Sequence, residues 1–120
     1  MKPMRLVFIC GPYRGKTDNE QLDNILKARY VAGLFWERGF VVICPHTNSF
    51  LLSGVTDESV FLKGYKEIIR RMHPGEDILV VVPGAEDSEG AQEEISLARS
   101  LGITVVETFD VGGVLVIPVF

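Results

Sequence analysis

The sequence predicts a single α/β domain with three layers, in which helices flank a mainly parallel sheet of four or five strands. Its 120 residues suit one domain spanning 1–120, and 47% of them are hydrophobic, which is enough for a core without disulfides. Short apolar runs alternate with longer segments of helical periodicity. This alternation implies right-handed crossovers between parallel strands, as in Rossmann-like or flavodoxin-like folds.

The strand prediction rests on apolar runs that turn residues or loops interrupt. Continuous hydrophobic runs are typical of strands covered on both faces. The predicted strands are residues 6–10, 41–44, 78–82 and 103–106. The apolar run 114–119 is either a fifth strand or a tail that packs on a partner.

The helix prediction rests on apolar spacing and on capping and stop residues. Helices are expected over residues 19–38, 57–72 and 88–101, with glycine just beyond the first and the last. The stretch 46–56 between the second strand and second helix is expected to be a loop.

Composition excludes several classes of function. The formal net charge is −4, so the chain carries no basic field for long nucleic acid. No apolar run has the length that a membrane span needs, and none resembles a signal peptide, so a cytoplasmic location is expected. Cys10 and Cys44 are expected to be free thiols, and with His46 and His73 they match no usual zinc spacing. We therefore predict neither a metal nor a cofactor.

The loop after the first strand, Gly11-Pro12-Tyr13-Arg14-Gly15-Lys16-Thr17, resembles a phosphate-binding P-loop at first sight. It is one residue too short, however, because only three residues separate its glycines. The glycines would still let a ligand approach the backbone, Arg14 offers a planar donor fork for an anion, and Tyr13 could stack on a flat ring. A tight turn with solvated Arg14 and Lys16 explains the same residues.

The third helix carries adjacent glutamates that a helical wheel separates. Glu94 falls within the apolar stripe of Ala91, Ile95 and Ala98, whereas Glu93 falls at its outer edge. A carboxylate on the buried side of a helix is costly unless it is used or paired. Glu94 is therefore either a functional carboxylate or one that a buried partner holds for structure. Ser88 is placed to cap the helix, whose N-terminus is a further anion site.

These features together resemble the nucleoside 2-deoxyribosyltransferase-like superfamily, which includes the deoxynucleoside 5'-monophosphate N-hydrolases. The matching residues span nearly the whole chain, and their order and spacing make the set specific. They are Phe8 to Tyr13, Asn24 and Ala28, Gly39, Pro45, Asp77 to Val82, and Ser88-x-Gly90-Ala91-x-x-Glu94-x-x-x-Ala98.

The resemblance implies a chemistry and roles for particular residues. Glu94 would be the nucleophile that attacks the anomeric carbon of a sugar and displaces the base, and Tyr13 would orient the sugar or the nucleophile. Arg14, Gly15 and Ser88 match positions that bind the 5'-phosphate in the monophosphate hydrolases. Hydrolysis of a phosphorylated substrate is therefore favoured over transfer to a second base.

One part of the family pattern is absent from this sequence. The family usually has an aspartate before the third strand that protonates or orients the leaving base, and here no aspartate occurs there until Asp77. Glu67 is the nearest acidic candidate, although a solvated helix charge explains it equally well. Asp77 is expected either to anchor the start of the strand or to form the floor of the site.

The predicted catalytic residues are accordingly Glu94, Tyr13 and Glu67. His46 and Asn48 are placed to contact base or sugar, although loop polarity also explains them. The full set of predicted substrate-binding residues is Gly11, Pro12, Arg14, Gly15, His46, Asn48, Asp77, Ser88 and Gly90.

The resemblance also implies a small-molecule nucleoside or nucleotide as partner. It further implies a homodimer or higher homo-oligomer, for which the apolar end 114–120 could serve as interface or as an edge strand. A non-catalytic nucleotide-binding or sensing domain of the same fold is the alternative function.

Overall fold

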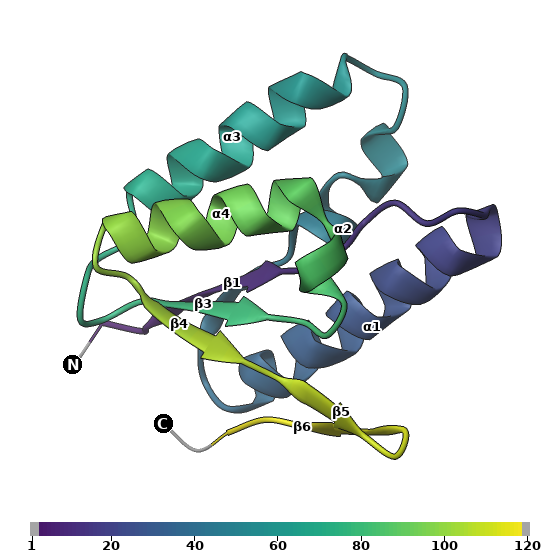
Figure 1. Ribbon diagram of the computed structural model, residues 1–120. Helices are drawn as coiled ribbons and strands as arrows, with labels where there is room; N and C mark the ends of the chain where they lie inside the picture. The colour runs from purple at the N-terminus through teal and green to yellow at the C-terminus, as the bar shows by residue number, and fades with distance from the viewer. Residues whose placement is uncertain (1–2, 119–120) are drawn as a thin grey trace.

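The computed structural model describes residues 3–118 and has the predicted α/β architecture (Figure 1). The central sheet is parallel, with the strand order β2-β1-β3-β4. Its strands are β1 (Leu6–Cys10), β2 (Val41–Ile43), β3 (Ile78–Val81) and β4 (Thr104–Glu107). The longer helices are α1 (Asp18–Glu37), α3 (Glu58–Arg70) and α4 (Glu89–Ser100).

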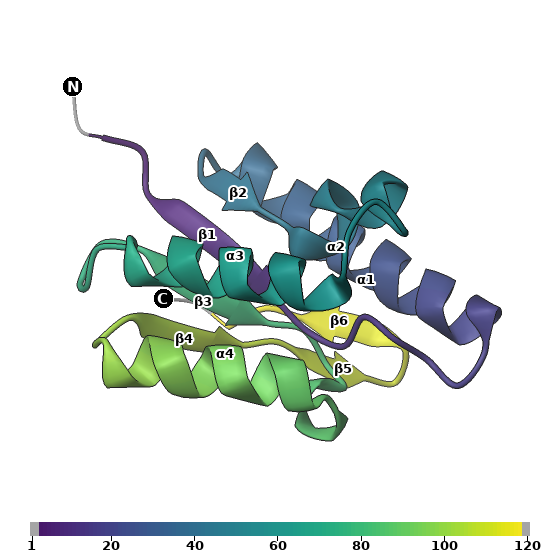
Figure 2. The ribbon, with the colours of Figure 1, turned by 90° about the horizontal axis from the view of Figure 1, so that it is seen from above.

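The strand order places the ligand-binding edge of the sheet. The chain leaves β1 toward β2 on one side and returns through α3 to β3 on the other side, so the order reverses between β1 and β3. Flavodoxin-like sheets bind ligands at this switch point, outside the carboxyl ends of the strands. Helix α1 covers one face of the sheet, and α3 and α4 lie side by side over the other (Figures 1 and 2).

The alternation of side chains along β1 builds the cores of both faces. Val7 and Ile9 point toward α1 and pack against Phe35, and Phe8 and Cys10 point toward α3 and α4. All four of these β1 side chains are fully buried. The predicted continuous apolar run is therefore explained by helices on both faces of the strand.

The structure differs from the sequence prediction between the second strand and α3. Residues 46–56 were expected to form a loop, but they contain most of a short helix α2 (Pro45–Asn48) and a 3-10 turn η1 (Phe50–Leu52). Proline is favourable at the first position of a helix, so Pro45 begins α2 as well as ending β2. A turn of 3-10 helix, η2 (Ala85–Asp87), likewise precedes α4.

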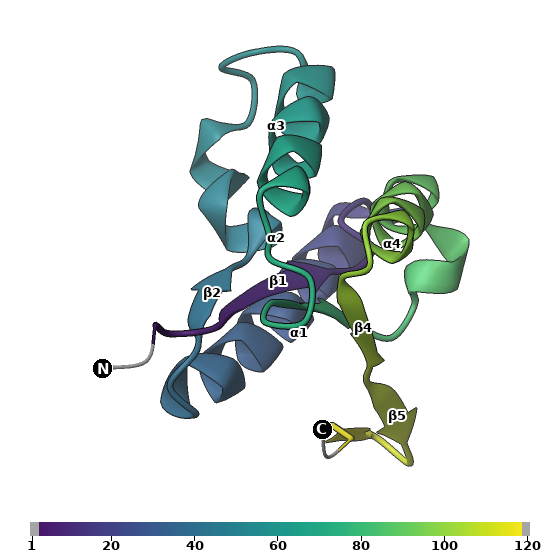
Figure 3. The same cartoon turned by 90° about the vertical axis from the view of Figure 1, so that its left-hand side faces the viewer.

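The apolar run after β4 forms neither a fifth strand of the main sheet nor a simple tail. Strands β5 (Phe109–Val111) and β6 (Val114–Val116) pair antiparallel as a separate hairpin (Figure 3). Gly112 and Gly113 both have positive φ, 60° and 84°, which suits the tight turn that joins β5 to β6. Leu115 and Ile117 pack against the core on the α1 side, whereas the predicted end of the strand at Val119 lies outside the described residues.

Asp77 lies at the start of β3 and ties together the N-terminal ends of two strands. Its Oδ1 accepts a hydrogen bond from the backbone N–H of Leu6 at 2.9 Å, and its Oδ2 accepts one from that of His73 at 2.7 Å. The side chain is buried, so these bonds are shielded from water. Of the alternatives, the structure places Asp77 as an anchor of the strand start, at the opposite end of the sheet from the carboxyl edge.

We expect Asp77→Ala to lower the free energy of unfolding by about 2–3 kcal/mol, because it leaves two backbone donors without acceptors. Urea denaturation followed by circular dichroism measures this loss. The neighbouring Glu76→Ala is the control, because the Glu76 side chain is exposed. Equal effects of the two substitutions would contradict the anchoring role of Asp77.

Candidate active site

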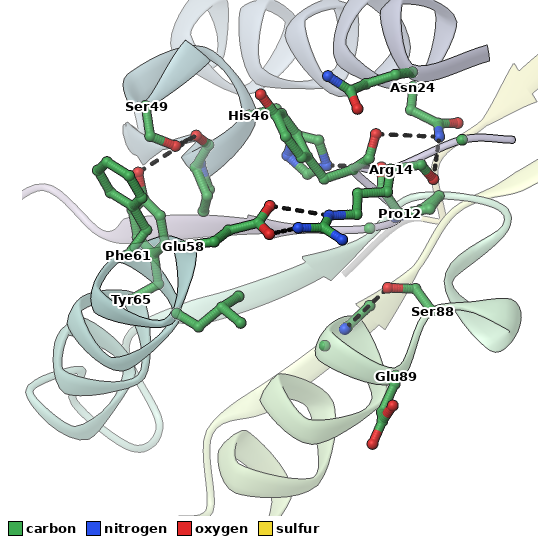
Figure 4. Close-up of a pocket in the computed structure, with 18 of the residues that line it drawn as sticks. Pro12, Arg14, Asn24, His46, Ser49, Glu58, Phe61, Tyr65, Ser88 and Glu89 are labelled. Carbon is green, nitrogen blue, oxygen red and sulfur yellow. Dashed lines mark hydrogen bonds and ion pairs between the residues drawn. The ribbon is translucent and has the colours of Figure 1, made fainter. Parts of the chain in front are cut away.

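A cavity of about 1530 Å³ opens at the carboxyl ends of the strands (Figure 4). Its walls come from the loop after β1, the first turns of α1, the α2–η1 segment, α3, and the η2–α4 junction. This space exceeds the roughly 300–1,000 Å³ of ordinary small-molecule pockets, so it has room for a nucleotide. The predicted residues that line it are Gly11, Pro12, Tyr13, Arg14, Gly15, His46, Ser88, Gly90 and Glu94.

Glu94 is the buried acidic group of this cavity. Its side chain projects from α4 and is only 8% exposed, whereas the adjacent Glu93 is exposed and pairs with Lys66 at 2.8 Å. The separation that the helical wheel predicted is therefore confirmed. The Cys10 thiol at the end of β1 lies 3.4 Å from Glu94 Oε1 and 3.4 Å from the carbonyl oxygen of Ala91.

The surroundings of Glu94 change its acidity. Burial raises the pKa of the carboxyl to about 7, although the Cys10 hydrogen bond and the Lys66 charge oppose the rise. Burial, with the nearby Glu94 charge, also raises the pKa of the Cys10 thiol, so Cys10 remains a donor at neutral pH. Glu94 thus changes protonation state near neutrality, which is the range expected of a group that takes part in chemistry.

Close packing explains the glycines of the first loop. A Cβ on Gly11 would lie 2.9 Å from the Cβ of Val82, so this position needs glycine for β1 and the end of β3 to approach. A Cβ on Gly15 would lie 2.5 Å from the Cβ of Glu20 in α1. The Asn24 side chain then holds the loop from α1 by donating to the carbonyl oxygens of Tyr13 and Arg14, at 3.4 and 3.3 Å.

His46 connects α2 to the same loop. Its Nε2 lies 3.0 Å from the carbonyl oxygen of Pro12, and its ring packs against that of Tyr13 with centroids 5.9 Å apart. Burial lowers the pKa of His46, so the ring is neutral at pH 7 and Nε2 carries the proton that Pro12 accepts. The buried Nδ1 then remains an acceptor that has no partner among residues 3–118.

Arg14 and Ser88 were predicted to bind phosphate, and both already have protein partners. Arg14 Nε donates to Glu58 Oε1 at 3.1 Å, and its Nη2 pairs with Glu58 Oε2 (Figure 4). Ser88 Oγ accepts the N–H of Ala91 at 3.2 Å and so caps α4, as predicted. Gly90 lies in the first turn of α4 and lines the cavity, where a Cβ would lie 3.9 Å from Leu62 Cδ2 of α3.

Three predicted site residues do not line the cavity. Glu67 lies on the exposed side of α3, where Arg70 and Arg71 pair with it at 3.5 and 3.3 Å. Asn48 donates to the Tyr65 hydroxyl at 3.2 Å and so supports a residue that does line the cavity. Asp77, as described above, lies at the other end of the sheet.

Several lining residues were not predicted as site residues. Glu58 and Tyr65 come from α3, and their contribution depends on how that helix packs over the sheet. Asn24 appeared in the family match without a role. Cys10, which contacts Glu94 but does not itself line the cavity, was expected only to be a free thiol. The alternation along β1 could have indicated Cys10, because it places the thiol on the α4 side of the sheet, opposite the stripe that contains Glu94.

Carboxylates outnumber cations around the cavity. Of the described lining residues, Arg14 and Lys16 are the cations, against the acidic Glu20, Glu58, Asp87, Glu89 and Glu94. No group of three or more His, Cys, Asp or Glu side chains in residues 3–118 is arranged to hold a metal ion. Within the same residues, no helix has the length and apolar character needed to cross a membrane.

A comparison with protein families matches residues 5–107 to DUF4406, described as a domain of unknown function. The chain belongs to this family. The match includes β1 to β4 and every residue that lines the cavity, and it ends just before the β5–β6 hairpin. No curated protein matches the sequence.

We expect Glu94→Gln to stabilise the fold above neutral pH. In the folded state the pKa of Glu94 is about 7, which is above its ordinary value of 4.5. Between pH 4.5 and pH 7, therefore, the folded protein keeps a proton on Glu94 that the unfolded protein has lost. Stability contributed by the protonated group is therefore present at pH 4 and is lost as pH rises toward 7. The Glu94→Gln variant does not suffer this loss, so its free energy of unfolding should exceed that of the wild type by up to about 3 kcal/mol at pH 8.

Urea denaturation at pH 4, 6 and 8 measures this difference, with Glu93→Gln as the matched control. Glu93 is exposed, so its substitution should give no such pH-dependent gain. A Glu94→Gln stability difference that does not change with pH would contradict the raised pKa.

Proposed function

We propose that this protein cleaves the N-glycosidic bond of a nucleoside or nucleoside 5'-monophosphate, with Glu94 as nucleophile and water as the favoured acceptor. The observation that carries the proposal is the position of Glu94: a carboxyl that is 8% exposed, yet lines a nucleotide-sized cavity at the switch point of the sheet. Its pKa of about 7 supplies an ionised fraction at neutral pH. The resemblance to nucleoside 2-deoxyribosyltransferase-like enzymes assigns the same residue this role.

In the first step, an ionised Glu94 oxygen attacks the anomeric carbon while the bond from that carbon to the base nitrogen breaks. The base leaves with the bonding electron pair and takes up a proton. In the second step, water attacks the anomeric carbon of the glycosyl ester, loses a proton and regenerates the Glu94 carboxylate. A second base in place of water would give transfer.

Residues of the first loop would hold the substrate during these steps. Tyr13 lines the cavity beside His46, and the tilted pair presents aromatic surface to a sugar or base. The hydrogen bond from His46 to Pro12 fixes this loop, so Tyr13 is presented from a supported backbone. The Cys10 thiol, at the end of β1, would fix the orientation of the Glu94 carboxyl through its hydrogen bond.

The proton donor for the leaving base is proposed from the cavity lining instead of from Glu67. Glu67 faces away and is paired with arginines, so it does not reach the space in which a base would lie. Asp87 and Glu89 line the cavity and are the acidic side chains that we propose for this role. The aspartate that is usual in nucleoside 2-deoxyribosyltransferase-like enzymes is absent, which favours the alternative of a domain that binds nucleotides without cleaving them.

A cytoplasmic location and homo-oligomeric assembly remain predictions of the same proposal. The buried, unpaired thiols Cys10 and Cys44 are compatible with a reducing compartment. The apolar end of the chain was predicted as a possible interface, and part of it, Leu115 and Ile117, already packs against the core of its own chain.

The enzyme hypothesis predicts that Glu94→Gln lowers base release by a factor on the order of 10³ or more, because the amide cannot act as nucleophile. The control Glu93→Gln should stay within about twofold of the wild type, because Glu93 is exposed and outside the cavity lining. Chromatographic detection of free base from the common ribo- and deoxyribonucleosides and their monophosphates, with and without an acceptor base, measures this. Ligand-induced thermal stabilisation without free base would instead support the binding domain.

The hydrogen bond from Cys10 predicts a specific pH profile. Because the ionised carboxylate attacks, kcat/KM should rise with pH through about 7 in the wild type. Removing the thiol donor in Cys10→Ala should move this midpoint upward by about half to one pH unit, and Cys10→Ser, which keeps a donor, should not. Equal upward shifts in both variants would show that packing, and not the hydrogen bond, is responsible.

A further inference from the structure

Arg14 and Glu58 meet at the cavity although they lie on different elements of the chain. Arg14 belongs to the loop after β1, and Glu58 is the first residue of α3. The guanidinium donates from Nε to Glu58 Oε1 at 3.1 Å and pairs through Nη2 with Oε2, which is the two-point geometry that arginine also uses for phosphate (Figure 4). The donor fork proposed for a ligand phosphate is therefore engaged by a carboxylate of the same chain.

Both backbones that carry this ion pair are held in place. Asp57 caps α3 by accepting the N–H of Ser59 at 2.9 Å, which fixes the helix start and with it Glu58. Asn24 donates to the carbonyl oxygen of Arg14 at 3.3 Å and so holds the loop against α1. The meeting of the two side chains follows from the packing of the loop and α3 around the cavity.

The other charges around the cavity also disfavour the binding of a 5'-phosphate. A 5'-phosphate would find Arg14 already paired, and Lys16 as the other cation among the described lining residues. It would also face Glu58 together with Glu20, Asp87 and Glu89. A nucleoside with a free 5'-hydroxyl experiences neither the competition for Arg14 nor this repulsion.

We propose that Glu58 determines substrate specificity by withholding Arg14 from a 5'-phosphate, so that the unphosphorylated nucleoside is the preferred substrate class. This inference rests on the proposed function of the cavity. The side chains of Arg14 and Glu58 are 74% and 44% exposed, so solvent screens the pair and a phosphate can displace Glu58 at moderate cost. Glu58 therefore sets a preference between two substrates that both fit.

The test compares each of the four common 2'-deoxynucleosides with its 5'-monophosphate. Values of kcat/KM for both are measured in the wild type, Glu58→Gln, Arg14→Ala and the double variant. The wild type should prefer the nucleoside, and Glu58→Gln should raise the ratio of monophosphate to nucleoside kcat/KM about two- to fivefold. Adding Arg14→Ala should abolish this gain, because the released guanidinium is what binds the phosphate.

Glu107→Gln is the matched control, because Glu107 also forms an exposed pair with an arginine, Arg99 at 3.7 Å, but lies outside the cavity lining. The Glu107→Gln variant should have the same ratio of monophosphate to nucleoside kcat/KM as the wild type. A wild type that prefers the monophosphate, or a Glu58→Gln ratio that is unchanged or lower, would overturn the inference while leaving base release intact.

Absence of base release from these substrates, and from the ribonucleosides and their monophosphates, would instead overturn the proposed function. Dissociation constants for the same nucleosides and monophosphates, measured by calorimetry in the same variants, then test the specificity role of Glu58 separately. A roughly two- to fivefold gain in relative monophosphate affinity in Glu58→Gln that disappears in the double variant supports that role, and an unchanged ratio overturns it.

Discussion

The contact between the Glu94 carboxyl and the Cys10 thiol, 3.4 Å apart, is the interaction on which the site depends. It joins the last residue of β1 to α4, and neighbouring features keep both ends in place. Gly11 lets β1 end tightly against Val82, and the Ser88 cap fixes where α4 begins. A buried carboxyl is costly in an otherwise apolar interface, so the fold retains at this point a group whose pKa is raised toward 7.

The sequence predicted those parts of the molecule that depend on local pattern. Apolar runs and helical spacing predicted β1 to β4, the three longer helices and the burial of Glu94, because each is set by which side of an element faces the core. The β5–β6 hairpin was missed although Gly112-Gly113 carries a hairpin signal. The short helix α2 was missed because Pro45, which interrupts the apolar run of β2, is also favourable at the first position of a helix.

Contacts between distant elements could not be predicted in the same way. The pairing of Arg14 with Glu58 requires α3 to lie over the loop after β1, and no local pattern encodes that distance. Glu67 is a case in which closeness in sequence was misleading. Its proximity to the third strand suggested a catalytic acid, but it lies on the exposed side of α3, where it pairs with arginines. The residues of the motif from Ser88 to Glu94 line one cavity because they belong to a single helix and its N-cap.

The acidic lining has a consequence for the proposed chemistry itself. Cleavage of an N-glycosidic bond passes through a transition state in which the sugar carries positive charge, as in glycoside hydrolysis. Carboxylates fixed around the cavity would stabilise such charge, and their exposure to solvent screens the effect. Glu20, Glu58, Asp87 and Glu89 would therefore act against a phosphate in the ground state and in favour of the sugar cation in the transition state. The same charges thus support both the reaction class and the preference for an unphosphorylated substrate.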